Sequence, residues 1–497
     1  MAVHPEDERY KNYIGKEYQA DFAGVHIKIK VVGDMAVDRN FGTGAVGITP
    51  AHSKIDEEIA SRHGLESVKI IDEYARMILP NSDLNRLKVS EARQKIVDWL
   101  KSQNLLEKEE EIVQNIATAE RTGGIIEPMP KLQWFINVNA KFKNKSDKFK
   151  DLAKGREITL KELMKKVVEN GQIEIIPERF SKIYFHWIDN LRDWCISRQI
   201  WYGHRIPVWY KGDKIFCDIN PPKEDGWTQD EDTLDTWFSS GLWTFSTLGW
   251  PENTEDLRAY HPTTVMETGY DIIFFWVARM ILMTTYLLGD IPFKTVYLHG
   301  LVRDGQGRKM SKSLGNIIDP LTMIEKYGAD ATRLSLIIGT GPGNDSKLSE
   351  DKIRGYKNFA NKMWNIARFV LENTDGIEFD ANFTGYTDED RAILSGAEKL
   401  SEEISEDMEK FRFYLAGEKL YHYAWHTFAD VILEESKKIF SGSQEDKKIS
   451  RKALLAKILR MLLVMLHPFI PFVTEEIWQQ MGHKNLLMTE KWFAGQK

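Results

Sequence analysis

The spacing of apolar and polar positions gives the chain three kinds of pattern. Residues 25–32 alternate between apolar and polar side chains, which predicts a half-buried strand. Apolar runs over 264–271 and 295–299 predict buried strands, and a run over 158–170 has helical spacing. Beyond residue 346 the periodicity is almost wholly helical, over 352–372, 389–409, 411–440 and 449–466.

These patterns predict a chain of the α/β plus all-α class with three domains. A β-rich domain is expected over 1–125, an α/β domain over 126–345 and a helical bundle over 346–497. Prolines near 128–130 and the glycine-rich run 339–343 interrupt the periodic pattern close to the two boundaries. The chain is long enough for two to four domains with large cores.

Composition narrows the classes of partner and site. The net charge of −7 argues against a protein that coats nucleic acid non-specifically, so any RNA contact must use local basic surfaces, and no DNA partner is expected. Two cysteines, Cys195 and Cys217, are too few for a four-cysteine zinc site, so no zinc site is expected. The apolar run 272–288 is short and contains Arg279, which predicts a buried helix and no membrane partner. A cytoplasmic location is expected.

A glycine-flanked loop with two lysines follows the strand predicted over 295–299. Lys309 and Lys312 offer compact positive charges to phosphate oxygens, and ligands bind beyond the carboxyl ends of strands in open α/β sheets. Glycines on both sides would let the loop close over a nucleotide. The spacing is not that of a P-loop. A solvated basic loop is the plain alternative, and the pattern alone favours it.

The run Lys309-Met310-Ser311-Lys312-Ser313, placed after His299-Gly300, resembles the signature loop of the class I aminoacyl-tRNA synthetases. Residues 187–209 and 235–243 are similar to the valyl branch of that family. The resemblance implies that 126–345 is the second half of a Rossmann-like catalytic domain. It assigns Lys309, Lys312 and Ser311 to catalysis, with both lysines stabilising the charge of the departing pyrophosphate.

The same resemblance assigns four more residues to ATP. Gly269 and Asp271 would help to hold the ribose, and His299 and Gly300 would border the adenine. As a lone aspartate at a helix start, Asp271 would be no more than a cap. Magnesium is expected with ATP, although no residue identifies a metal site.

Residues 41–52 join a glycine-rich turn to a short strand and resemble the editing domain inserted in valyl-tRNA synthetases. The resemblance assigns Asp56, which would anchor the amino group of a misattached amino acid, His52, Thr43 and Gly44 to an editing site in a partial editing domain over 1–125. From the residues alone, a structural role for His52 and Asp56 is the more common one.

Ser53 departs from the family, which usually has a second aspartate there, and this puts a role at that position in doubt. Editing has a physical cause, because a pocket shaped for valine cannot strongly reject threonine, and valyl enzymes are a well-known example. No nucleophilic serine or cysteine with a partnered base occurs in this region, so water is the expected attacker.

Residues 356–365 and 467–478 look like the anticodon-binding domain of the same family, and the tRNA contacts are assigned to Lys357, Lys362 and Arg368. The whole resemblance implies ATP-dependent activation of valine, its transfer to tRNA(Val), and hydrolysis of threonyl-tRNA(Val). Alternatives are a non-ligating tRNA-binding or trans-editing factor, or a relative of isoleucyl- or leucyl-tRNA synthetases.

The second nucleotide signature of the class, His-x-Gly-His, does not occur in the sequence. The first half of the catalytic sheet and the main valine pocket are therefore expected to lie elsewhere, in a truncated sequence or in a split enzyme with a separate N-terminal chain. The 497-residue chain is expected to be poorly soluble alone and inactive in aminoacylation without that part.

Overall fold

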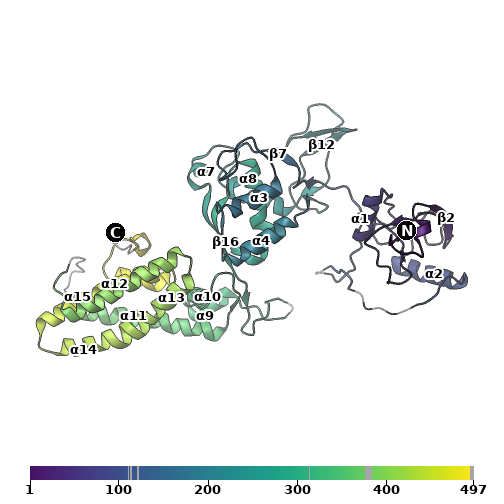
Figure 1. The fold of residues 1–497 in the computed structure, drawn as a ribbon. Helices are drawn as coiled ribbons and strands as arrows, with labels where there is room; N and C mark the ends of the chain where they lie inside the picture. The colour runs from purple at the N-terminus through teal and green to yellow at the C-terminus, as the bar shows by residue number, and fades with distance from the viewer. Residues whose placement is uncertain are drawn as a thin grey trace. The chain divides into compact units, whose positions relative to one another are not determined.

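The computed structural model describes residues 1–109, 111, 113, 115–119, 122–312, 314–374 and 383–492. It divides into two compact units, Met1–Gln133 and Trp134–Lys497 (Figure 1). The first unit thus extends a few residues beyond the predicted limit of 125. The α/β and helical parts lie together in the second unit, and the three-domain division stays a prediction.

The first unit combines short strands with two helices. Strand β1 (Ala2–Val3) lies between β4 (Val32–Gly33), which is parallel to it, and β5 (Ala45–Val46), which is antiparallel. The predicted alternating strand is confirmed as β3 (Val25–Lys30), which forms an antiparallel hairpin with β2 (Glu17–Phe22). The helices are α1 (Lys54–His63) and α2 (Val89–Ser102), and each packs on its own small apolar cluster.

A three-stranded parallel sheet forms the centre of the α/β part. The predicted buried strands are confirmed as β16 (Thr263–Gly269) and β17 (Phe293–His299). Strand β17 lies in the middle, with β16 on one side and β9 (Glu174–Ile176) on the other. Because the strands are parallel, all three carboxyl ends reach the same edge of the sheet. Gly269 pairs with His299 at that edge.

Helices bury the apolar faces of this sheet. Helix α3 (Leu160–Glu169) begins at a capping box formed by Thr159 and Glu162, and it packs against α4 (Arg179–Asp189) and α8 (Ala278–Leu287). The window Tyr270–Leu287 is long and apolar enough to cross a membrane. However, α8 lies between two strands of the sheet in sequence and contributes fully buried side chains to the core, as the core helix of a globular protein does.

Smaller elements surround the sheet. Three antiparallel pairs and a three-stranded antiparallel sheet are formed by β6 (Phe135–Ile136) with β10 (Trp194–Cys195), β7 (Lys141–Lys143) with β8 (Glu157–Thr159), β11 (Ser197–Arg198) with β15 (Thr233–Leu234), and β12 (Val208–Lys211) with β13 (Lys214–Cys217) and β14 (Thr228–Gln229). The short helices α5 (Thr236–Gly241), α6 (Trp243–Ser246) and α7 (Glu255–Tyr260) precede β16, and a 3₁₀ turn (Tyr270–Ile272) and a π-helical turn, η3 (Ile273–Val277), lead into α8.

Beyond β17 the chain turns towards the helical part. Strand β18 (Val302–Arg303) pairs in parallel with β19 (Ser346–Lys347), and between them lie the lysine loop, α9 (Pro320–Tyr327) and α10 (Ala329–Ile337). Helix α9 is well delimited, because Asp319 caps its first turn and Pro320 occupies its first position.

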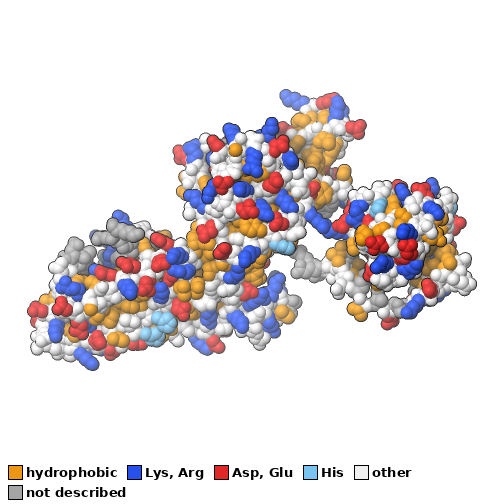
Figure 2. Space-filling model, in the orientation of Figure 1, with side chains coloured by type: hydrophobic (Ala, Val, Ile, Leu, Met, Phe, Trp, Pro, Cys, Tyr) orange, Lys and Arg blue, Asp and Glu red, His pale blue; other side chains and the backbone are white. Residues whose placement is uncertain are grey.

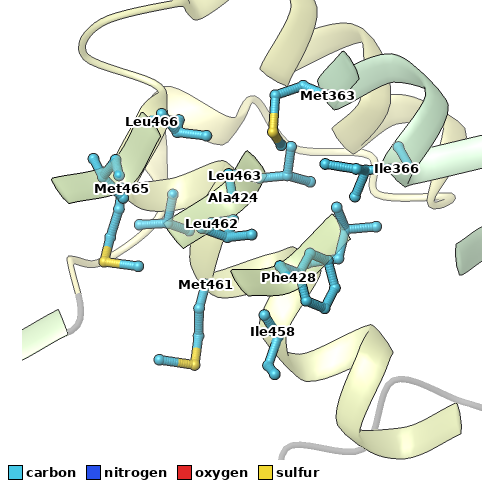
Figure 3. Packing of buried hydrophobic residues seen from close by; sticks show 14 of the residues in the cluster. Met363, Ile366, Ala424, Phe428, Ile458, Met461, Leu462, Leu463, Met465 and Leu466 are labelled. Atoms are coloured by element: carbon cyan, nitrogen blue, oxygen red, sulfur yellow. The ribbon is translucent and has the colours of Figure 1, made fainter. Parts of the chain in front are cut away.

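The helical part confirms the predicted helical periodicity. It consists of α11 (Glu350–Thr374), α12 (Asp388–Glu409), α13 (Phe413–His422), the π-helix η4 (Tyr423–Leu433), α14 (Glu434–Ser441), α15 (Glu445–Leu466) and α16 (Pro471–Gln480). Helix α15 is buried from Ala453 to its end except at Lys457 and Arg460, and side chains such as Met363 and Phe428 pack against it (Figure 3).

Two buried polar clusters hold the helical part in register. Arg451 on α15 and Asp390 on α12 form an ion pair of 2.7 Å, and their side chains are 1% and 2% exposed. On α10, the carboxylate of Asp330 accepts hydrogen bonds from the backbone N–H groups of Phe472 and Val473 and so caps α16. Helix α10 also contributes Leu334 and Ile338 to the helical core.

Candidate active site

The carboxyl edge of the sheet brings together the residues predicted to bind ATP. A methyl group added to Gly269 would stand 2.6 Å from Asp271 Oδ1 and 3.5 Å from His299 Cε1, so no side chain fits between them. Asp271 is exposed, and within the described residues its carboxylate has no hydrogen-bond or ion-pair partner. The imidazole of His299 lies 2.7 Å from the carbonyl of Gly300 and 3.3 Å from Glu267 Oε1.

A close backbone contact explains the glycine at position 300. A Cβ atom there would stand 1.9 Å from the carbonyl oxygen of Asn344, which no side-chain movement can relieve. The glycine-rich segment containing Asn344 thus packs directly on the chain leaving β17. Gly343 donates a hydrogen bond to the carbonyl of Leu298, and Arg179 at the start of α4 donates to Asn344 Oδ1 at 2.8 Å. The floor of the site is therefore rigid.

Asp345 fixes the base of the lysine loop. Its carboxylate accepts hydrogen bonds from the backbone N–H of Leu301 at 2.8 Å, the phenol of Tyr270 at 3.0 Å and the guanidinium of Arg303. Burial acts to raise the pKa of Asp345, but these three donors outweigh it and hold the pKa below its ordinary value. The first residues of the loop are thus tied to the end of β16.

The loop itself is held by a staple between Asp304 and Asn316. Asn316 Nδ2 donates to Asp304 Oδ2 at 2.9 Å and to the carbonyl of Lys309 at 3.2 Å, and Asn316 Oδ1 accepts from the N–H of Ser311 at 2.9 Å. Asp304 also accepts from the N–H and Nε of Arg308. The bond from Asn316, followed by those from Arg308, holds the pKa of the Asp304 carboxyl well below its usual range.

The staple leaves both lysines available. Lys309 and Lys312 are exposed, and in the part of the loop that the structure describes neither ammonium has a hydrogen-bond or ion-pair partner. Met310 between them packs against a small apolar cluster formed by α9, α10 and α11. The hydroxyl of Ser311 accepts from the N–H of Leu314 at 3.3 Å, whereas Ser313 lies outside the described residues. The loop therefore presents two positive charges from an anchored backbone.

A charged cluster forms around the buried carboxylate of Asp235. Asp235 lies between Arg198 at 3.0 Å and Arg279 at 3.3 Å, and the guanidinium of Arg279 lies 4.0 Å from the ring centroid of Trp194. Burial lowers the pKa of Arg279 to about 10, although Asp235 opposes this shift. The cluster links α8 to the strands that precede it.

The three residues predicted to bind tRNA lie on α11 but not on one face. At about 100° per residue, Arg368 falls about 20° from Lys357, whereas Lys362 falls about 140° away. Lys362 pairs with Asp430 at 3.0 Å, and Lys357 lies 5.9 Å above the ring of Tyr327. Lys357 and Arg368 share their exposed face with Trp364, so these three residues are the more compact candidate surface.

The predicted editing residues form two separate groups in the first unit. Asp56 Oδ2 accepts from the N–H of Thr49 at 2.9 Å, and the two ring nitrogens of His52 contact the carbonyl of Pro128 at 2.9 Å and the N–H of Ile70 at 3.0 Å. His52 thus joins three segments of the chain, as a structural histidine does.

Thr43 and Gly44 belong to the turn before β5. Gly44 has a positive φ of 75°, and a Cβ atom there would stand 2.5 Å from the guanidinium of Arg9. Across the described residues, no hydrogen bond joins this turn to His52 or Asp56.

Sequence reasoning missed the residues that shape the loop. Asp304, Asn316 and Asp345 carry most of its hydrogen bonds, yet they are separated by 12 and 29 positions and follow no periodicity. The one available signal was Asp304 followed by a glycine-rich turn, because an aspartate at that position often accepts bonds from the next backbone N–H groups.

Comparison with known proteins identifies the family. The model described as tRNA synthetases class I (I, L, M and V) matches residues 12–224 and 212–349, which together make up more than half of the chain. The chain belongs to the class I tRNA synthetases. The model described as the anticodon-binding domain of tRNA ligase matches residues 390–497. A class I catalytic fold is therefore followed by a helical anticodon-binding domain.

Relatives within the class are valine–tRNA ligases. That of Bdellovibrio bacteriovorus is 44% identical over 499 residues, and that of Clostridium acetobutylicum is 45% identical over 492 residues. Each alignment covers 97% of this chain and 54% of the relative. The chain thus spans about half the length of the curated relatives it matches.

Solved structures support the same fold. A methionyl-tRNA synthetase from Mycobacterium tuberculosis, bound by methionyl-adenylate, matches 75% of this chain and 67% of its own with a TM-score of 0.57 and 20% identity. A LeuRS from Agrobacterium radiobacter, in a ternary complex with tRNA and LeuAMS, covers 63% of this chain and 46% of its own, with a TM-score of 0.52 and 22% identity.

Proposed function

We propose that this chain forms part of a valine–tRNA ligase, which activates valine with ATP and transfers it to tRNA(Val). The observation that carries this proposal is the stapled loop, where Lys309 and Lys312 stand unpaired beyond the carboxyl edge of a parallel sheet. The proposed amino acid is valine because the similar sequences are those of valine–tRNA ligases.

The proposed chemistry is electrostatic. When valine attacks the α-phosphate of ATP, negative charge grows on the departing pyrophosphate, and two ammonium groups on an anchored backbone stabilise it without reorganisation. Asp271 would accept hydrogen bonds from the ribose hydroxyls, and Gly269 keeps the space beside it open. Magnesium would accompany the phosphates.

The free edge of the sheet supports the proposal that another polypeptide segment completes the site. Among the described residues β16 pairs only with β17, so its other edge carries unpaired backbone groups. Large apolar side chains also stand exposed on neighbouring helices, including Trp187 of α4 at 46% and Phe275 of η3 at 45%. We propose that a segment bearing the His-x-Gly-His signature docks here, as an earlier part of the same polypeptide or as a separate chain.

Valine-dependent exchange between ATP and pyrophosphate tests the ligase proposal. The 497-residue chain alone should show no exchange, and exchange should appear when the N-terminal segment of a valine–tRNA ligase is supplied. In that completed enzyme, Lys309→Ala or Lys312→Ala should lower the rate about 10²–10³-fold. The control is Lys294→Ala, an exposed lysine at the opposite end of β17. Exchange by the chain alone would refute the need for an N-terminal segment, and full activity of both loop variants would refute the role proposed for the two lysines.

Isoleucine- or leucine-dependent exchange in place of valine would assign the enzyme to a related branch. The valine-dependent reaction is favoured because the relatives at 44% and 45% identity are valine–tRNA ligases.

We also propose that the first unit contributes to hydrolysis of threonyl-tRNA(Val). The support is Asp56, half-buried at the start of α1, where one carboxylate oxygen is held by Thr49. Asp56→Ala should abolish deacylation by the completed enzyme, whereas Glu57→Gln beside it should not. Because Asp56 also stabilises its own helix, thermal unfolding must show that the variant is folded.

A non-ligating factor is the second candidate function, and the chain itself favours it in one respect, because the first unit forms a compact body. It predicts that the 497-residue chain alone deacylates threonyl-tRNA. Absence of that activity would exclude this candidate. We propose that the protein acts with its tRNA in the cytoplasm.

A further inference from the structure

The helical part contains a surface cavity of about 460 Å³ between α12, α13 and η4. Leu400 and Leu415 provide apolar lining, and Glu418, His422, Tyr423 and His426 provide polar groups. Figure 2 shows histidine side chains gathered on the surface of the helical part. None of these residues takes part in the ATP, editing or tRNA assignments above.

His422 and His426 form a pair at a spacing that suits metal chelation. They stand four residues apart, and their ring centroids are 5.6 Å apart with an angle of 31° between the planes. Histidines at this spacing share one face of a helix and are the commonest protein ligands of transition metals. With a metal about 2.0–2.1 Å from each nitrogen at a tetrahedral angle, the ring centroids would lie roughly 5 Å apart. The observed separation of 5.6 Å is close to this value.

A carboxylate stands behind one of the two rings. His426 Nδ1 faces Asp430 Oδ2 at 3.5 Å, which leaves Nε2 free to bind a ligand. Metal-binding histidines usually have a carboxylate or carbonyl at the other ring nitrogen, which orients the ring and strengthens it as a ligand. Asp430 is in turn paired with Lys362 at 3.0 Å. This ion pair holds the carboxylate beside the ring of His426.

The cavity also contains an unsatisfied polar group. The phenol oxygen of Tyr423 is buried, and in the described structure it has no hydrogen-bond partner. The π-helix η4 begins at this residue, between the two histidines in sequence, and π-helical turns are rare and often found at functional sites.

We propose that His422 and His426 bind one divalent transition-metal ion, of the class of Zn²⁺, Ni²⁺ or Cu²⁺. Within the described residues no three histidine, cysteine, aspartate or glutamate side chains are grouped to hold an ion, so the site has two protein ligands and water completes the coordination. Imidazole nitrogen selects these ions over Mg²⁺ and Ca²⁺, which prefer oxygen. Counting cysteines alone could not predict this site.

Calorimetric titration of the full chain with NiCl₂ or ZnCl₂ tests the proposal. One equivalent should bind, and His422→Ala or His426→Ala should weaken binding at least tenfold, because each leaves a single imidazole. Asp430→Asn should weaken it about 10- to 100-fold through the orientation of His426. The matched control is His26→Ala, because His26 is also exposed beside a carboxylate, at 2.9 Å from Asp21, but has no histidine four residues away.

Two outcomes would overturn the proposal: unchanged affinity in both His422 and His426 variants, or an equal loss in the His26 variant. Electron paramagnetic resonance of the Cu²⁺-loaded chain gives a second readout. It should show nitrogen couplings from two imidazoles in the natural sequence and from one in either single variant. Couplings that stay the same in both variants would place the ion elsewhere. The histidines are exposed, so thermal unfolding without metal should be unchanged.

Discussion

Removing the side chain of Asn316 should loosen the lysine loop without unfolding the protein. Asn316→Ala deletes three hydrogen bonds, to Ser311, Asp304 and Lys309. Each such bond contributes about 0.5–1.5 kcal/mol net, so the sum is about 3 kcal/mol. Asn316 is only half-buried, so hydrogen bonds to water will replace part of the lost energy. The net loss of local stability is then about 2 kcal/mol. That loss raises the population of the open loop about 30-fold.

Hydrogen exchange followed by mass spectrometry measures this opening. The amide of Ser311 loses its own acceptor in this variant, so faster exchange there does not test whether the whole loop opens. The informative amide is Arg308, which donates to Asp304 and does not touch Asn316. If the staple holds the loop as a unit, Arg308 should also exchange about 30-fold faster. Asn373→Ala, which removes one hydrogen bond to Phe369 in α11, is the matched control. An Arg308 amide that exchanges at the natural rate would refute the reasoning.

Three further predictions concern stability. Gly300→Ala should lower the free energy of unfolding in urea by about 3 kcal/mol or more, because the backbone at Asn344 must move to admit the new methyl group. Gly396→Ala, on the open face of α12, should raise it by about 0.5–1 kcal/mol. Equal effects of the two substitutions would contradict this reasoning. Arg451→Ala should cost about 3–5 kcal/mol by leaving Asp390 buried and unpaired, and the double variant with Asp390→Ala should lose less than the sum of the two single losses. Burial lowers the pKa of His261, so the unfolded chain binds a proton at this residue more tightly than the folded chain does. The contribution of His261 to stability is therefore full above its ordinary pKa near 6.5 and is lost as the pH falls below that value. His261→Phe should reduce the fall in melting temperature between pH 7 and pH 5.5.

The features that could be predicted from the sequence are those that depend on the local spacing of apolar residues. The buried strands ending at Gly269 and His299 and the helices of the C-terminal part follow from apolar spacing, and the loop lysines follow from their place after a strand. Their position at one sheet edge followed from the rule that parallel strands share an edge.

Pairing between distant residues could not be predicted in this way. Lys362 was assigned to tRNA, but Asp430 meets it from a helix 68 positions farther on. His52 was assigned to editing, and its contact with Pro128 spans 76 positions. Such contacts depend on how elements pack, which a single sequence does not show. The separation of Lys362 from Lys357 and Arg368 around α11 could have been calculated from helical geometry alone.

The capping of α16 by Asp330 has a consequence for how such proteins exchange parts during evolution. The first turn of α16 takes its hydrogen-bond acceptor from α10, 142 positions earlier, and α10 also supplies Leu334 and Ile338 to the helical core. A gene fusion that joined a foreign segment at residue 346 would remove both the acceptor and these apolar side chains. A transferred module that keeps both must therefore begin before residue 329, ahead of α10, and not at the boundary between the α/β and helical patterns.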